Sequence, residues 1–412
     1  MSAFSIPLSG LAASSSSLNV IANNLANLNT DGYKDQSLNF ASVFNEVQGT
    51  SGNGDPIQIG NGVQTVGTVS NDANGNIDST GIASNMALQG NGFFVVKSAG
   101  ETSYTRDGDF TVNSQGQLTT PEGQLVMGYQ ATNGVVSNSS ALGPIVVNQA
   151  NNVPASATST FEMSTNLDAG SATGATFSSP ITVYDSLGES HVLTINYTNA
   201  GNNKWNYTIT VPAADVGQTG NPVQVNAGSL QFNSSGDLTA PTGTIPNIAV
   251  TGLADGGANM NLTWNLDTTA GTPAITQQSG ASATSATTQN GFASGTLTGY
   301  SILPDGTVQG QFTNNQTLAL GQVAVASFAN NQGLTQVGGN DYQASFASGS
   351  AVVGIAGQGG NGTITGGAVE ESNVNLSTEF ANMIVAQQGY EANAKVLTTL
   401  DQVSQATLAV IQ

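Results

Sequence analysis

Two stretches decide the fold: LAASSSSLNVIANNLANL at residues 11–28 and LSTEFANMIVAQQGYEANAKVL at residues 376–397. In the first stretch, apolar residues recur in steps of seven, three and four, with Ser14 as the one polar interruption. This spacing is typical of an α-helix with a heptad seam. The predicted seam residues are Leu11, Leu18, Ile21, Leu25 and Leu28.

The second stretch alternates steps of four and three, which predicts a C-terminal helix of about 35 residues. Ser377 precedes Thr378 and Glu379, where a capping hydroxyl and an early carboxylate suit the positive end of the helix dipole. Gly389 costs a helix about 1 kcal/mol relative to Ala, so we expect close packing there. The predicted seam residues are Leu376, Phe380, Met383, Tyr390, Ala394 and Leu397.

Each apolar stripe has two interpretations. The usual one is an amphipathic helix that packs on its own domain. These two helices, however, lie at opposite ends of the chain with a long β-like middle between them, and little else in one copy is left for them to cover. This placement favours a coiled coil formed between subunits.

The middle of the chain predicts short strands separated by turns. Residues 92–127 and 181–232 both contain alternating apolar segments bounded by Gly-containing turns. Residues 295–328 resemble the first set, so the simplest topology is nested, with one β domain inserted into another. We therefore predict a mainly β protein with α-helical termini, in which nested barrel-like or sandwich-like β domains are carried on a helical coiled-coil domain.

Polar stretches of small residues mark the predicted domain limits. The predicted domains are a terminal helical domain at 1–30 and 368–412, an extended linker region at 31–70 and 335–367, a middle β domain at 71–147 and 290–334, and an inserted β domain at 148–289.

Composition excludes several classes of function. The 412 residues include 5 Lys and Arg against 25 Asp and Glu, so the net charge of -20 would repel nucleic acid and anionic membranes. The chain has no Cys and therefore no disulfide or thiolate chemistry. No Sec-type signal and no run of 18 apolar residues is visible, so we expect neither Sec export nor membrane insertion.

The motifs tested for chemistry favour a non-enzymatic protein. His191 belongs to an alternating strand, where a neighbouring Ser190 points to the opposite face. The GQGGNG motif at 357–362 is followed by residues that cannot open a phosphate-binding helix. Residues 72–76 begin like a calcium loop, but Ile77 replaces the required Gly. We therefore predict no catalytic, cofactor-binding or metal site.

Longer motifs at both ends carry a resemblance. LNVIANNLANLNTDGYK at 18–34, GAVEESNVNL at 367–376 and MIVAQQGYEANAK at 383–395 closely resemble the rod and hook family of flagellar axial proteins. Gly92-Phe93-Phe94 and Tyr104-Thr105-Arg106-Asp107-Gly108 are shared with the distal rod members. VYDSLGESH at 183–191 and LGQVAVASFANNQGL at 320–334 are similar to the hook members, as is the greater length.

The resemblance implies a structural subunit of a flexible tube that transmits torque from rod to filament. It implies self-assembly with an inner tube of terminal helices and two outer β layers, together with contacts to the distal rod protein, the hook cap protein and the hook-filament junction protein. It also implies an extracellular position in the basal body and hook after type III export. Gln388 replaces an often basic residue, so one electrostatic contact of the inner wall is expected to be missing.

Two other functions remain open at this point. A distal rod subunit would lack the inserted domain. A secreted β-rich adhesin or carbohydrate-binding module would need a ligand groove lined by aromatic residues, but Trp205 and Trp264 are few and isolated.

Overall fold

The computed structural model describes residues 2–44, 46–50, 56–98, 100–132, 134–147, 152–268 and 271–411. The predicted domain limits at residues 1, 148 and 412 lie outside this set. The chain divides into two compact units. We call residues 1–148, 299–311 and 317–412 the helix-bearing unit, and residues 149–298 and 312–316 the inserted unit.

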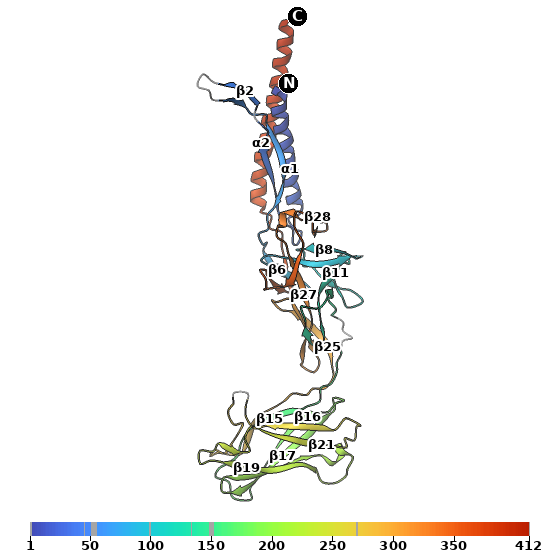
Figure 1. Cartoon of the computed structure of the whole chain (residues 1–412), viewed down its shortest axis with the longest axis vertical. Coiled ribbons are helices and arrows are strands. Elements are labelled where there is room, and N and C mark those ends of the chain that lie inside the picture. The colour runs from blue at the N-terminus through green and yellow to red at the C-terminus, as the bar shows by residue number, and fades with distance from the viewer. Residues whose placement is uncertain are drawn as a thin grey trace. The chain divides into compact units, whose positions relative to one another are not determined.

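The helix-bearing unit begins with helix α1 (Ser2–Ala26) and ends with helix α2 (Leu376–Ile411). These helices pack against each other (Figure 1). Asn375 caps α2, because its Oδ1 accepts hydrogen bonds from the backbone N–H groups of Ser377 and Thr378 at 3.0 and 3.1 Å. The cap therefore lies two residues before the predicted Ser377. Neither helix, over its described residues, has the length and hydropathy needed to cross a membrane.

The strands of the helix-bearing unit pair in sheets that bring distant parts of the chain together. β5 pairs with β32 and β6 with β31, so segments near the two termini share sheets. The strands are β1 (Gln36–Ser42), β2 (Glu46–Thr50), β3 (Pro56–Ile59), β4 (Val63–Ser70), β5 (Ile77–Ser79), β6 (Met86–Gln89), β7 (Phe93–Ser98), β8 (Glu101–Thr105), β9 (Thr111–Val112), β10 (Leu118–Thr119), β11 (Leu125–Thr132), β12 (Val135–Val136), β13 (Gly143–Pro144), β27 (Thr317–Ser327), β28 (Thr335–Gly338), β29 (Asp341–Gln343), β30 (Val352–Ile355), β31 (Thr363–Gly366) and β32 (Ala368–Glu370).

The main sheet of this unit runs in the order β26-β27-β11-β7-β8-β29-β28. Both of its faces are packed, because β7 places Phe94 and Val96 in one apolar cluster and Phe93 and Val95 in another. The unbroken apolar run in β7 follows from this burial on both sides. β25 (Gly295–Ile302) and β26 (Thr307–Phe312) cross the division between the units, and a short 3-10 helix, η2 (Asn331–Gly333), follows β27.

The inserted unit is a β-sandwich of two five-stranded sheets (Figure 1). One sheet has the order β16-β17-β18-β19-β20, and the other has β21-β22-β15-β23 with β24 beside β15. The elements of the sandwich are β15 (Thr160–Asn166), β16 (Thr176–Tyr184), β17 (Ser190–Gly201), β18 (Lys204–Val211), the 3-10 helix η1 (Ala213–Val216), β19 (Val223–Phe232), β20 (Leu238–Ala240), β21 (Thr244–Val250), β22 (Met260–Asn265), β23 (Ile275–Thr276) and β24 (Ala283–Gln289). β14 (Asn152–Val153) pairs with β25 instead.

A single apolar core fills the sandwich. Trp205 of the first sheet and Trp264 of the second are both buried in it, and Phe161 stacks on Trp264 with ring centroids 5.9 Å apart. β17 shows how the sequence specifies this core, since its side chains alternate between buried and more exposed positions over most of its length. The predicted fold class, mainly β with paired helical termini, is confirmed.

The predicted linker residues form strands. Residues 36–70 hold the β1–β4 and β2–β3 pairs, and the GQGGNG motif lies in the turn between β30 and β31. The motif is followed by a strand rather than by a helix, as its sequence indicates.

Candidate assembly surface at the paired terminal helices

The two helices run antiparallel. Gly10 lies beside Asn393, and Ser14, further along α1, lies beside Gly389, which precedes Asn393 in α2. A Cβ on Gly389 would lie 3.3 Å from Oγ of Ser14, so this glycine allows the close packing expected of it. Because α2 has 36 residues and α1 has 25, the C-terminal end of α2 extends beyond the start of α1 (Figure 1).

The predicted seam of α1 is mostly covered within one chain. Ile21 is buried, and Leu11, Leu18 and Leu25 are half-buried. Leu28 is also half-buried, but it lies in the turn after α1 ends at Ala26.

The predicted seam of α2 is half exposed. Leu376, Phe380 and Tyr390 are exposed, whereas Met383, Ala394 and Leu397 are half-buried. The residues of α2 that lie nearest α1 are small or polar, among them Ala386, Gly389 and Asn393. The apolar residues therefore flank the helix contact instead of filling it.

The side of α2 that faces away from α1 is mostly polar near the middle of the helix. Residues 388, 391 and 395 are spaced by three and four, so they share one side. They are Gln388, Glu391 and Lys395, and all three are exposed. Ile384, one turn before Gln388, and Phe380, one turn before Ile384, are exposed apolar residues on this side. Gln388, which departs from the pattern of the resembled family, thus has its side chain in solvent.

A groove of about 660 Å³ lies between α1, α2 and the β1–β4 strand pair. Its lining includes Ala13, Ile21, Phe40, Val385 and Ala386. At its edge, Oδ1 of Asp35 and Oε2 of Glu379 are buried and have no hydrogen-bond partner among the described residues. The groove thus combines an apolar lining with two unused acceptors.

Asn24 and Tyr33 hold the C-terminal end of α1 to the residues that follow it. Oδ1 of Asn24 accepts hydrogen bonds from the Tyr33 hydroxyl and from the backbone N–H of Gln36 at 3.1 and 3.0 Å. Asn373, just before α2, accepts the backbone N–H of Asp35 at 2.7 Å. Within the linker region predicted at 31–70, residues 33–36 are thus held to α1 and to the segment that precedes α2.

A buried charge cluster joins the segment after α1, the segment before α2 and the end of β8. Glu370 accepts Lys34 Nζ at 2.6 Å on Oε1 and Arg106 Nη1 at 3.4 Å on Oε2. All three side chains are at most 3% exposed. Burial lowers the pKa of both Lys34 and Arg106 from their ordinary values, and the charge of Glu370 opposes this effect.

The backbone completes the cluster. Lys34 also donates to the carbonyl of Ala73 at 2.9 Å, Arg106 donates to the carbonyl of Gly90 at 2.7 Å, and Gly75 N–H donates to Oε1 of Glu370 at 2.8 Å. Gly32 is required here, because its φ is +69° and a Cβ would lie 2.6 Å from the backbone of Arg106. Residues 73–75, within the stretch that begins like a calcium loop, thus serve as hydrogen-bond partners of this cluster.

Lys34, Arg106 and Glu370 lie within motifs of the resembled family, but the sequence pattern indicates no role for them. The sequence does contain a partial indication of the buried cluster, since Lys34 and Arg106 are two of only five basic residues in the chain and each lies within a motif. In a chain so poor in charge, such a residue can indicate a buried partner. The signal does not decide the matter, because Lys395 also lies within a motif and is exposed.

Four family models match parts of the chain between residues 6 and 410. They are described as flagella basal body rod protein (residues 6–34), flagellar hook protein FlgE/F/G D1 domain (87–168), flagellar basal body protein FlaE D2 domain (152–292) and flagellar basal body rod FlgEFG protein C-terminal (365–410).

Several full-length proteins are similar to this chain. The flagellar hook protein FlgE of Escherichia coli K12 is 35% identical, with 97% of this chain and 98% of that protein covered. The same protein of Salmonella typhimurium is 34% identical over 97% and 98%, and that of Treponema pallidum is 32% identical over 96% of each.

A solved structure shares the fold. The crystal structure of Helicobacter pylori flagellar hook protein FlgE2 matches with a TM-score of 0.52 at 15% identity, over 70% of this chain and 98% of that one. From the identities and coverages of the full-length relatives, the chain belongs to the flagellar hook protein FlgE family.

Proposed function

We propose that this chain is a structural subunit of the bacterial flagellar hook that assembles with copies of itself into a tube. The observation that carries the proposal is the row of exposed apolar residues on α2, in a chain whose relatives at 32–35% identity are hook proteins along their whole length.

A second copy is the occupant that suits this surface. An apolar flank on a helix costs free energy while it faces water, at about 25 cal/mol per Å². A long helix with such flanks on both sides of its internal contact can bind neighbouring helices of the same kind. Leu376, Phe380 and Tyr390 are the members of the predicted seams that a single copy leaves exposed. The proposed assembly residues are both predicted seams, Leu11, Leu18, Ile21, Leu25, Leu28, Leu376, Phe380, Met383, Tyr390, Ala394 and Leu397.

The buried charge cluster gives each subunit a rigid connection for torque. Lys34 follows α1, Glu370 precedes α2 and Arg106 follows β8, so a force on either helix reaches the main sheet through charged hydrogen bonds. Bending, in contrast, requires neighbouring copies to slide. Surfaces rich in Ser, Thr and Asn support this, since water-mediated contacts exchange at low cost.

The finer assignments rest on the family. We infer that the subunit lies in the hook on the cell exterior, that it leaves the cell by the flagellar type III route, and that the distal rod, hook cap and hook-filament junction proteins are its partners. The predicted division into a helical inner tube, a middle β layer and an outer β layer belongs to the same proposal. A deletion strain that keeps rods and loses hooks would distinguish this function from that of a distal rod subunit.

Electron microscopy of the purified chain under polymerising conditions tests the assembly directly. We expect curved tubes of uniform width from the natural chain and none from Leu25→Asp or Leu397→Asp, with both compact units still folded by circular dichroism. Tubes formed by both variants would contradict the assignment of the seams.

A further inference from the structure

His191 is the only histidine in the chain, and the strand pattern forces it inward. In β17, His191 has the same alternation as Leu193 and Ile195, so its ring points to the interior side of the sheet. The ring is 4% exposed. Three carboxylates lie near it, those of Asp185, Asp215 and Asp255.

One of these carboxylates fixes the orientation of the ring. Oδ2 of Asp215, in η1, lies 3.0 Å from Nδ1 of His191. This leaves Nε2 on the opposite side of the ring, buried and without a hydrogen-bond partner among the described residues. Oδ2 of Asp255 is 3.6 Å from Nε2, beyond hydrogen-bond distance.

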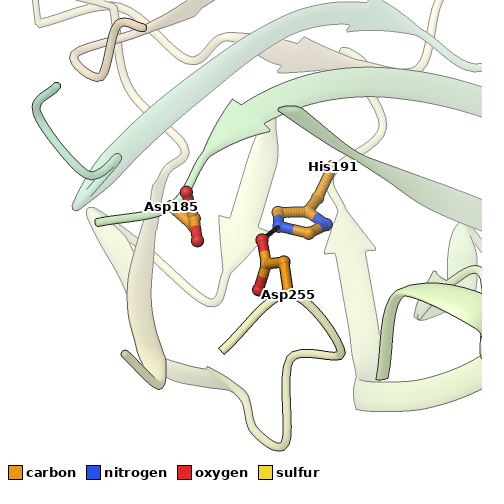
Figure 2. A group of neighbouring side chains, drawn as sticks. All are labelled: Asp185, His191 and Asp255. Atoms are coloured by element: carbon orange, nitrogen blue, oxygen red, sulfur yellow. Dashed lines mark ion pairs between the residues drawn. The ribbon is translucent and has the colours of Figure 1, made fainter. Parts of the chain in front are cut away.

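Asp185 presents a second unused atom to the same place. Its side chain is fully buried, and Oδ1 accepts the backbone N–H groups of Leu187 and Glu189 at 2.9 and 2.8 Å. Oδ2 has no partner in the described part of the chain. Gly257 passes so close that a Cβ there would lie 1.9 Å from Oδ2. Figure 2 shows the carboxylates of Asp185 and Asp255 beside the ring of His191.

The donors and acceptors of this group are not matched to one another. Asp185, Asp215 and Asp255 place three carboxylates around a single imidazole. A buried carboxylate oxygen without a donor is costly, and two carboxylates that face each other repel. A bound cation would remove both costs, and the donor atoms of Asp185, His191 and Asp255 already lie within 4.8 Å of one another.

We propose that Asp185, His191 and Asp255 form a binding site for one divalent metal ion of the zinc class. One imidazole nitrogen with two carboxylate oxygens suits Zn²⁺ better than Ca²⁺ or Mg²⁺, which take oxygen ligands. Asp215 holds the other ring nitrogen, in the manner of the carboxylates that orient metal-binding histidines. Three protein ligands leave a position for water.

The ion would fasten a loop to a hairpin. Asp185 and His191 flank the turn between β16 and β17, whereas Asp255 lies in the loop between β21 and β22. Two hydrogen bonds already guide this loop: Ala254 N–H donates to the carbonyl of Asp215, and Ala258 N–H donates to Oγ of Ser186, both at 2.9 Å. A small closing movement of Asp255 brings all three donors to a common ion. The site therefore stabilises the inserted unit, whether or not the chain polymerises.

Zinc titration of the EDTA-treated full chain tests the site. We expect one equivalent of Zn²⁺ to bind, the single imidazole ¹⁵N signal of Nε2 to shift, and the melting temperature of the inserted unit to rise by about 5 °C or more at a hundredfold excess over the dissociation constant. Ca²⁺ and Mg²⁺ are expected to cause neither change.

Variants separate this site from adventitious binding. Asp255→Asn and Asp185→Asn should abolish equimolar binding, and Asp215→Asn should weaken it by about 10–100-fold. Glu189→Gln, which removes an exposed carboxylate from the same turn, should bind like the natural chain. Since Asp255 lies on a partly exposed loop, its variant should fold even if Asp185→Asn does not.

Three results would each overturn the proposal. They are the absence of an equimolar Zn²⁺ ion on the natural chain, Zn²⁺ binding that leaves the imidazole signal unmoved, and undiminished binding by Asp255→Asn. Preference for Ca²⁺ over Zn²⁺ would overturn the assigned metal class.

Discussion

The inserted unit and helix α2 differ in how far they bury their large apolar side chains. Among the described residues of the inserted unit, the large apolar side chains that stay exposed are Leu187 and Val192. Among the described side chains of α2, the exposed ones of this kind are Leu376, Phe380, Ile384, Val385, Tyr390, Val396, Val403 and Leu408. The inserted unit thus completes its core within one chain, whereas α2 does not.

This difference separates folding from assembly. Full burial of one Val, Leu, Ile or Phe side chain contributes about 1.5–3 kcal/mol. Several such side chains on α2 supply enough to offset the lost freedom of a joining subunit. The inserted unit has no comparable surface among its described residues. We therefore expect the terminal helices to supply most of the free energy of assembly and the sandwich to supply little of it.

The largest expected effect is loss of assembly by Val385→Asp. Val385 is 69% exposed, so a charge there should change the stability of the single subunit by only about 0.5 kcal/mol. In the polymer, the same charge would be buried against a neighbour, and sedimentation should show subunits alone. Gln388→Asp, on the polar side of α2, is the matched control and should assemble more readily than Val385→Asp. Equal assembly of both variants would refute the role of the apolar flank.

The next effect concerns the buried cluster. Glu370→Gln leaves Lys34 and Arg106 buried without their anion, which should cost about 3–5 kcal/mol in the free energy of unfolding. Calorimetry should show a lower transition for the helix-bearing unit and an unchanged one for the inserted unit.

Glu371→Gln provides the control for this variant. Glu371 is the adjacent exposed carboxylate, and Asn76 donates to it at 3.0 Å. We expect its replacement to change stability by less than about 1 kcal/mol. If Glu370→Gln were as mild, the cluster would not connect the helices to the sheet in the way proposed.

A smaller effect is expected from Asp107. Burial, with added repulsion from Asp31 and Asp109, raises the pKa of this carboxyl to about 6 from its ordinary 3.8. The folded state therefore binds a proton more tightly than the unfolded state, and stability should fall as pH rises from about 4 to about 6. Asp107→Asn should remove this loss and raise stability at pH 7 by about 1–2 kcal/mol, after allowance for solvent screening. Urea unfolding across this pH range would check it, and an unchanged pH profile would contradict it.

Periodicity made the elements predictable. The heptad steps predicted both helices, and alternation predicted strands such as β17, because local spacing alone determines which side chains share a face. The length of α2 agrees with the prediction because its apolar stripe is long and unbroken. No Pro or Gly follows Gly389 to end the helix earlier. The cap was misplaced by two residues, since Asn375 and Ser377 are both good caps and the sequence does not choose between them.

Contacts between distant residues were not predictable. Gly389 indicated close packing, but the stripe of α2 did not indicate that Ala386 and Asn393 would lie beside α1, because neither residue contributes to an apolar pattern. Glu370 pairs with Lys34 from the opposite end of the chain, and Asp255 reaches His191 through a loop. Neither pairing follows from sequence spacing, and both require the folded sheets to bring the residues together.

The most direct test of the central claim uses a single thiol in place of Val385. The natural chain has no Cys, so Val385→Cys introduces one reporter on the exposed flank of α2. We predict that a water-soluble thiol reagent modifies this residue rapidly in the single subunit and at least about tenfold more slowly in the polymer, where a neighbouring copy covers it. Equal modification rates in both states would show that the flank stays open to water and would contradict the account.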